Sequence, residues 1–123
     1  MKILLLSTAA LLALATHADA ARFSAVNGSR LSAMCTSRDA KMSNSCTAYI
    51  EGVSDSMSLY QELRPQDGSR GGALPGYVCV PEQVTGLQQR DTVVAWIRQH
   101  PEAGTRQASG VVADALREAF ACR

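Results

Sequence analysis

The stretch at residues 44–57 reads "NSCTAYIEGVSDSM" and decides the fold class. Apolar residues recur in it at three- and four-residue spacing, which is the period of one face of an α-helix. This stripe continues to residue 60 and comprises Cys46, Tyr49, Ile50, Val53, Met57 and Tyr60. Gly52 lies inside the helix, where glycine costs about 1 kcal/mol relative to alanine. We expect a neighbouring helix to approach closely at Gly52, with a functional hinge as the alternative.

Cys46 at the beginning of this helix has two interpretations. A helix N-terminus lowers the pKa of a thiol, so Cys46 could be an activated nucleophile. It could equally be half of a disulfide. The compartment of the protein and the other cysteines distinguish these interpretations.

The N-terminal sequence indicates the compartment. Residues 1–20, "MKILLLSTAALLALATHADA", combine Lys2, an apolar run and a small-x-small cleavage site ending at Ala20. The apolar run is shorter than the roughly 20 residues that a membrane-spanning helix needs. We therefore predict a secretory signal peptide at 1–20, removal of that peptide, and a single periplasmic domain at 21–123.

Four cysteines fall within residues 21–123, and an even number in an exported domain of this size indicates two disulfides. Four cysteines allow three connectivities. We favour Cys35–Cys46, which would clamp the turn between the first two helices, together with Cys79–Cys122, which an antiparallel pair of later helices would bring close. A catalytic Cys46 would leave an unpaired cysteine and would need a base, and His100 is the only histidine after residue 20.

Three more helices follow from the same periodicity. A short helix over "RLSAMC" is capped by Asn27 or Ser29, and another begins at Thr85 with Gln88 completing a capping box and ends before Pro101. Its expected inner face comprises Leu87, Val93, Val94, Trp96 and Ile97. The last helix, for which Thr105 is the expected cap, has a stripe of Ala108, Val111, Val112, Ala115, Leu116, Ala119 and Phe120. The expected fold is all-α, a small bundle of about four helices stapled by two disulfides.

Residues 64–77, "RPQDGSRGGALPGY", interrupt the helical pattern. Glycine and proline are frequent and there is no apolar period, so we predict a loop. A loop of this length in a small domain is often functional or disordered. Its polar side chains Arg64, Gln66, Asp67 and Arg70 are the residues that we predict to contact a partner.

Catalytic and ligand-binding motifs give little support for an enzyme. The chain has no HExxH, CxxC, GxSxG or P-loop pattern. Glu51 and Asp55 lie four residues apart on one helix, but such pairs are most often solvated surface. We expect no catalytic residues, metal or cofactor, and the net charge of +1 indicates neither a nucleic-acid-binding face nor a membrane-binding one.

Four segments in order resemble one family. "CTAYIEGVSD", "VCVPEQVT", "VVAWIRQHPE" and "ALREAFAC" are similar to the pattern of Rap/Tai immunity proteins, from about Leu31 to Cys122. The resemblance implies a helical, disulfide-bearing periplasmic protein, commonly a homodimer, that binds and blocks a type VI secretion amidase effector.

Two other functions compete with this one. A small periplasmic helical chaperone or stress protein would also be exported and disulfide-bonded, and an enzyme using Glu51 and Asp55 is a third hypothesis. If the chain is an inhibitor, the contact surface is the 64–77 loop, the shorter 100–107 turn or a helical face. The 64–77 loop is our prediction, because it is the longest segment able to protrude into a cleft.

Overall fold

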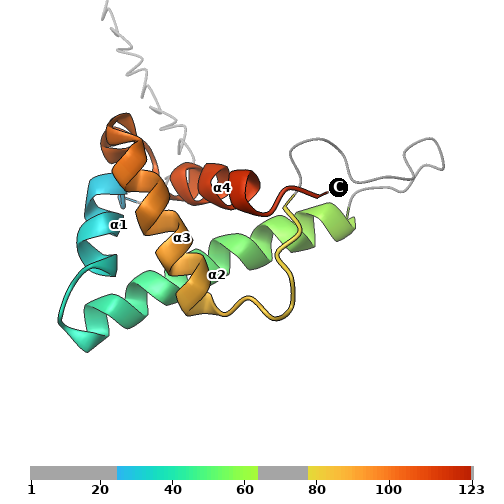
Figure 1. The fold of residues 1–123 in the computed structure, drawn as a ribbon, viewed down its shortest axis with the longest axis horizontal. Coiled ribbons are helices and arrows are strands. Elements are labelled where there is room, and N and C mark those ends of the chain that lie inside the picture. The colour runs from blue at the N-terminus through green and yellow to red at the C-terminus, as the bar shows by residue number, and fades with distance from the viewer. Residues whose placement is uncertain (1–24, 64–77, 123) are drawn as a thin grey trace, which may run out of the picture.

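The computed structural model describes residues 25–63 and 78–122 of the chain. Within them the helices are α1 (Gly28–Cys35), α2 (Ala40–Leu63), α3 (Gly86–Gln99), the short 3-10 helix η1 (Pro101–Thr105) and α4 (Ala108–Ala119). Figure 1 shows α2 as the long base on which α1, α3 and α4 pack. The all-α prediction is confirmed.

Local sequence sets several helix boundaries. The Asn27 side chain accepts a hydrogen bond from the Arg30 amide at 2.9 Å and caps α1. Thr85 and Gln88 form the expected capping box at the start of α3, with bonds of 2.8 and 3.2 Å. The fourth helix differs from the prediction, because Thr105 ends η1 and Gln107 precedes α4 without a side-chain cap.

One apolar core joins the helices. Leu31, Ile50, Val93, Val111 and Leu116 are fully buried in it, each from a helical stripe that the sequence predicts. Burying side chains of this size contributes about 1.5–3 kcal/mol each. The core is the principal favourable contribution to the fold.

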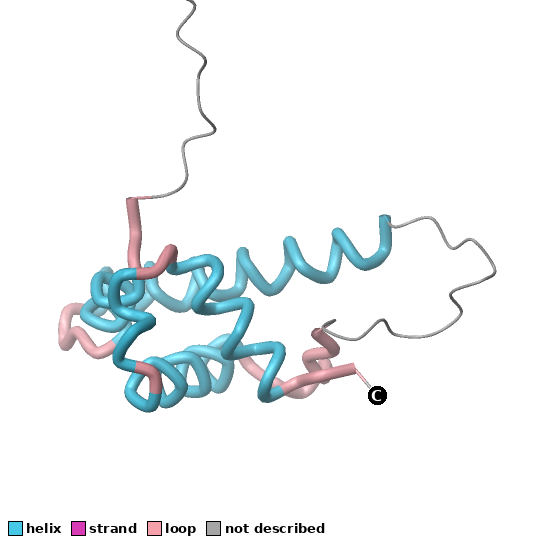
Figure 2. The backbone as a smooth tube through the Cα atoms, turned by 90° about the horizontal axis from the view of Figure 1, so that it is seen from above, coloured by secondary structure: helices cyan, strands magenta, loops and turns pink. Residues whose placement is uncertain are grey.

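The ends of three stripes were predicted wrongly. Tyr60 is 58% exposed because α2, the longest helix, extends beyond the rest of the bundle (Figure 2). Ala119, in the last turn of α4, is also exposed. Leu87 is 55% exposed, whereas Gly86 lies against the Glu51 side chain of α2 and Arg90 donates a hydrogen bond to Ser43 of α2.

The expected close approach at Gly52 is also wrong. A Cβ built at Gly52 meets no atom within 4 Å apart from its own helix and chain neighbours. The close approach occurs instead at Gly28, where a Cβ would overlap the carbonyl oxygen of Ala103 and lie 2.9 Å from its carbonyl carbon. Gly28 therefore allows the backbone of α1 to contact η1.

Both favoured disulfides are present. Cys35 and Cys46 join α1 to α2 with Cα atoms 5.1 Å apart, and Cys79 and Cys122 join the segment before α3 to the end of α4 at 4.9 Å. Both distances lie within the usual range for a disulfide. Cys46 is thus a fully buried structural half-cystine, and the nucleophile interpretation is excluded.

Candidate partner-binding end

One end of the bundle holds the two flanks of the predicted loop, and we call it the clasp end. It consists of the last two turns of α2, residues 78–80 and residues 120–122. Figure 1 shows α2 reaching past α3 toward the C-terminus, beside the segment that leads into α3. Leu59 and Tyr60, at 54% and 58% exposure, leave apolar surface on this part of α2.

Gln61 links α2 to the backbone of Val78. Its side-chain amide donates to the Val78 carbonyl at 3.0 Å, and its amide oxygen accepts from the Val78 N–H at 2.8 Å. Both polar groups of Val78 are thereby satisfied, which matters because this residue is only 4% exposed and an unpaired buried amide is costly. Gln61 takes the place that a second strand would have beside Val78.

The end of α4 contacts the same segment. Val78 and Ala121 form an isolated antiparallel bridge, and the Cys79 N–H donates to the Phe120 carbonyl at 2.8 Å. The Cys79–Cys122 disulfide closes this contact covalently. Cys79 is exposed and Cys122 half-buried, whereas Cys35 and Cys46 are both buried.

The predicted partner-binding residues Arg64, Gln66, Asp67 and Arg70 lie outside the described residues. What the structure describes is the base from which their segment starts and to which it returns. Because Gln61 is bonded to Val78 across 17 residues of sequence, the two flanks are held together.

The second candidate, the 100–107 turn, is an ordered part of the bundle. It contains η1, whose Ala103 is fully buried against α1, while Pro101 and Glu102 are exposed. Gln107, the residue before α4, forms an isolated antiparallel bridge with Asn27, the residue before α1. The turn therefore presents a short, fixed edge.

Glu51 and Asp55 are both exposed on α2, in agreement with their interpretation as solvated surface. The Glu51 carboxylate also lies over Gly86 in the first turn of α3, where an added Cβ would collide with it. Negative charge near a helix N-terminus is favourable. The position of Glu51 is therefore accounted for by helix packing.

His100 forms a local cluster that the sequence does not predict. Its ring stacks on Trp96 with centroids 3.8 Å apart, and its Nδ1 lies 2.9 Å from the Trp96 carbonyl. A carbonyl only accepts, so Nδ1 is the protonated ring nitrogen. The Trp96 Nε1–H donates to Glu118 on α4 at 2.8 Å. The cluster joins the end of α3 to α4.

Among residues 25–63 and 78–122, no three metal-ligating side chains gather into a group that could hold an ion. No helix in the same ranges has the length and apolar character needed to cross a membrane.

Gln61 is the residue of this candidate site that the sequence does not predict. It stands in a polar position of an amphipathic helix, and nothing local marks it as the partner of a backbone 17 residues away. Gly28 was missed for a similar reason, although its place directly after the Asn27 cap is a recognisable boundary signal.

The described residues form a small all-α, disulfide-stapled domain in which the residues on both sides of the 64–77 segment are held together. The family model for Rap1a immunity proteins matches residues 27–122. The chain therefore belongs to the Rap1a immunity protein family, and the family resemblance of the four segments is confirmed. Among curated proteins and among solved structures, none matches the chain significantly.

Proposed function

We propose that this protein is a periplasmic immunity protein that binds a type VI secretion amidase effector and blocks its active cleft. The family match over residues 27–122 carries the proposal. The two disulfides support it, because disulfides persist in oxidising compartments such as the periplasm. In this proposal residues 1–20 are the signal peptide that directs the chain there.

The proposed contact groups are Arg64, Gln66, Asp67 and Arg70 in the 64–77 segment. The Gln61–Val78 hydrogen bonds and the Cys79–Cys122 disulfide support this choice, because they fix the flank on each side. Restricting the ends of a binding segment lowers the entropy that binding must overcome. Arginine is also enriched among residues that dominate binding energy.

Protection of a bacterial cell tests the function. A candidate type VI secretion amidase would be directed to the periplasm of a host cell, and we expect lysis that co-expression of the full chain prevents. A variant lacking residues 2–20 should fail to protect although it is produced, because it remains on the wrong side of the membrane. Lysis at the same rate with and without the full chain would refute inhibition of that amidase.

A shortened variant tests the contact surface. Replacing residues 66–73 by a Gly-Ser link should leave the helical fold intact and abolish protection. The matched control, Glu102→Ala in the exposed part of the 100–107 turn, should protect as the wild type does. Wild-type affinity of the shortened protein for the amidase would place the contact elsewhere on the molecule.

The same proteins distinguish the chaperone alternative. A chaperone would suppress aggregation of unrelated unfolded clients at stoichiometric amounts, and we expect no such suppression. General suppression without amidase binding would favour the alternative.

A further inference from the structure

The two disulfides differ in how a reactant reaches them. Cys35 and Cys46, at 7% and 0% exposure, belong to the apolar core, so a thiol reaches this bond only when the bundle opens. Cys79 is exposed and its partner Cys122 is half-buried, so this bond meets solvent in the folded protein. Access to sulfur is one of the factors that set the rate of thiol–disulfide exchange.

We propose that Cys79–Cys122 is a thiol-exchange site, which a dithiol reductant opens in the folded protein while Cys35–Cys46 remains closed. A thiolate of the dithiol attacks the Cys79 sulfur, which forms a mixed disulfide and releases Cys122 as a thiolate that takes up a proton. The second thiolate of the reductant then attacks its own sulfur in the mixed disulfide and releases Cys79. The protein bond gains two electrons and two protons, and the dithiol becomes a disulfide.

The contacts around the Cys79–Cys122 disulfide indicate which residues its reduction affects. Besides the disulfide, residues 78–80 are held by the two Gln61–Val78 hydrogen bonds, by the bridge to Ala121 and by the bond from Cys79 to Phe120. The fully buried core residues lie in or beside α1, α2, α3, η1 and α4, and they keep their partners when this covalent link opens. Opening therefore removes the covalent hold on the residues that follow α4 and leaves the bundle folded.

The consequence is a local change set by thiol chemistry. In the closed form the flank of α3 and the end of α4 are joined covalently. In the open form they are held by hydrogen bonds and by the packing of Val78, Val80 and Phe120 against the core. Whether the clasp end is closed or open depends on the thiols around the protein. This dependence does not require that the protein inhibit an amidase.

The test is stepwise reduction of the purified oxidised protein by dithiothreitol, with thiols trapped by iodoacetamide and assigned by peptide mass spectrometry. We expect Cys79 and Cys122 to be labelled first, at least about tenfold faster than Cys35 and Cys46, because the buried pair reacts only after a larger opening. Far-ultraviolet circular dichroism should stay unchanged through this first step. Hydrogen exchange should quicken at the Cys79 amide and not at the Leu31 amide.

Two double variants, each lacking one disulfide, serve as controls. Cys79→Ala with Cys122→Ala should show only the slow step, and Cys35→Ala with Cys46→Ala only the fast one. If the double variant of Cys35 and Cys46 fails to fold, the order in which the four cysteines of the wild-type protein are labelled tests the proposal alone. Simultaneous labelling of all four cysteines, earlier labelling of Cys35 and Cys46, or loss of helicity during the first step would each overturn the proposal.

Discussion

The two ends of the bundle are held together by different means. At the closed end, which comprises α1, η1 and the first turn of α4, backbones contact one another directly. Gly28 donates to the Arg106 carbonyl at 3.0 Å, Ala108 donates to the Val26 carbonyl at 3.0 Å, and Ala103 and Ala108 are fully buried. At the clasp end one backbone bridge is reinforced by a disulfide and by the side chain of Gln61.

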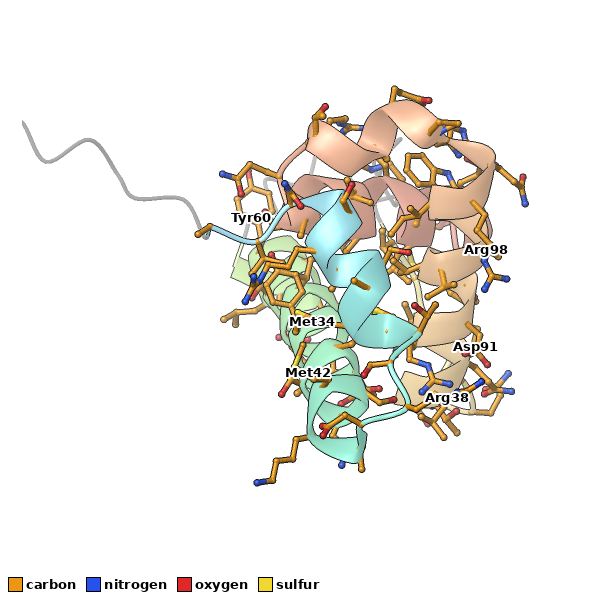
Figure 3. All side chains as sticks on the ribbon, turned by 90° about the vertical axis from the view of Figure 1, so that its left-hand side faces the viewer. Met34, Arg38, Met42, Tyr60, Asp91 and Arg98 are labelled. Carbon is orange, nitrogen blue, oxygen red and sulfur yellow. A yellow bond between two sulfur atoms is a disulfide. The ribbon has the colours of Figure 1, made fainter. Side chains whose placement is uncertain are left out.

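Figure 3 looks at the molecule from the left-hand side of Figure 1, the side on which α1 lies. Met34 of α1 and Met42 of α2 lie on the same flank there, while Arg98 and Asp91 mark the opposite flank on α3. Asp91 and Arg98 are exposed, whereas Gly28, Ala103 and Ala108 are buried where α1, η1 and α4 meet. Small residues let α1, η1 and α4 approach closely, and the Cys35–Cys46 disulfide links α1 to α2, whereas the projecting end of α2 has fewer neighbours to pack against.

The largest expected loss of stability is at the closed end. Leu31→Ala removes a fully buried side chain of α1 and should lower the free energy of unfolding by about 2–5 kcal/mol, because a cavity remains. Urea unfolding followed by circular dichroism measures the change. Leu59→Ala, at an exposed position of α2, is the control and should lie within about 0.5 kcal/mol of the wild type. Equal losses in the two variants would contradict the assignment of the core.

The second effect compares the disulfides. Replacing Cys79 and Cys122 by alanine should cost about 4 kcal/mol and replacing Cys35 and Cys46 about 3 kcal/mol by loop entropy alone, since the loops differ in length. The sequence separations are 43 and 11 residues. Urea midpoints of the two double variants measure the difference. A larger loss for the buried pair would mean that its packing in the core outweighs loop entropy.

A third prediction contrasts two glycines. Gly28→Ala should destabilise by about 1–3 kcal/mol, because the new methyl group overlaps the backbone of Ala103. Gly52→Ala, at an exposed helical position with open space around it, should stabilise by about 0.5–1 kcal/mol. If α1 contacts η1 at Gly28, the melting temperature falls in Gly28→Ala and rises in Gly52→Ala. A neutral Gly28→Ala would show that α1 and η1 can separate without cost.

The smallest effect concerns the clasp end. Gln61→Ala removes both hydrogen bonds to Val78 and should cost about 1–2 kcal/mol, because a buried amide loses its partner. Hydrogen exchange at the Val78 amide should also quicken. Gln99→Ala, in an exposed position at the end of α3, is the matched control and should leave that amide unchanged. Unchanged exchange in Gln61→Ala would mean that other contacts protect Val78.

The four α-helices and the central core residues follow from the sequence, which also favours one of three disulfide connectivities, the one that the structure contains. The helices and the core depend on local pattern: apolar period places Ile50, Val93 and Leu116 inward, and Thr85 with Gln88 marks a helix start. Periodicity identifies the apolar side of a helix without reference to any other element.

Which residues of that apolar side are covered by neighbouring helices depends on the tertiary structure. Tyr60 and Leu87 continue their stripes and are exposed, because covering a residue depends on how far the neighbouring helix extends. The position of close backbone contact, at Gly28 and not at Gly52, depends on how α1 meets η1. The pairing of Gln61 with Val78 likewise depends on two segments 17 residues apart meeting in space, which no local pattern encodes.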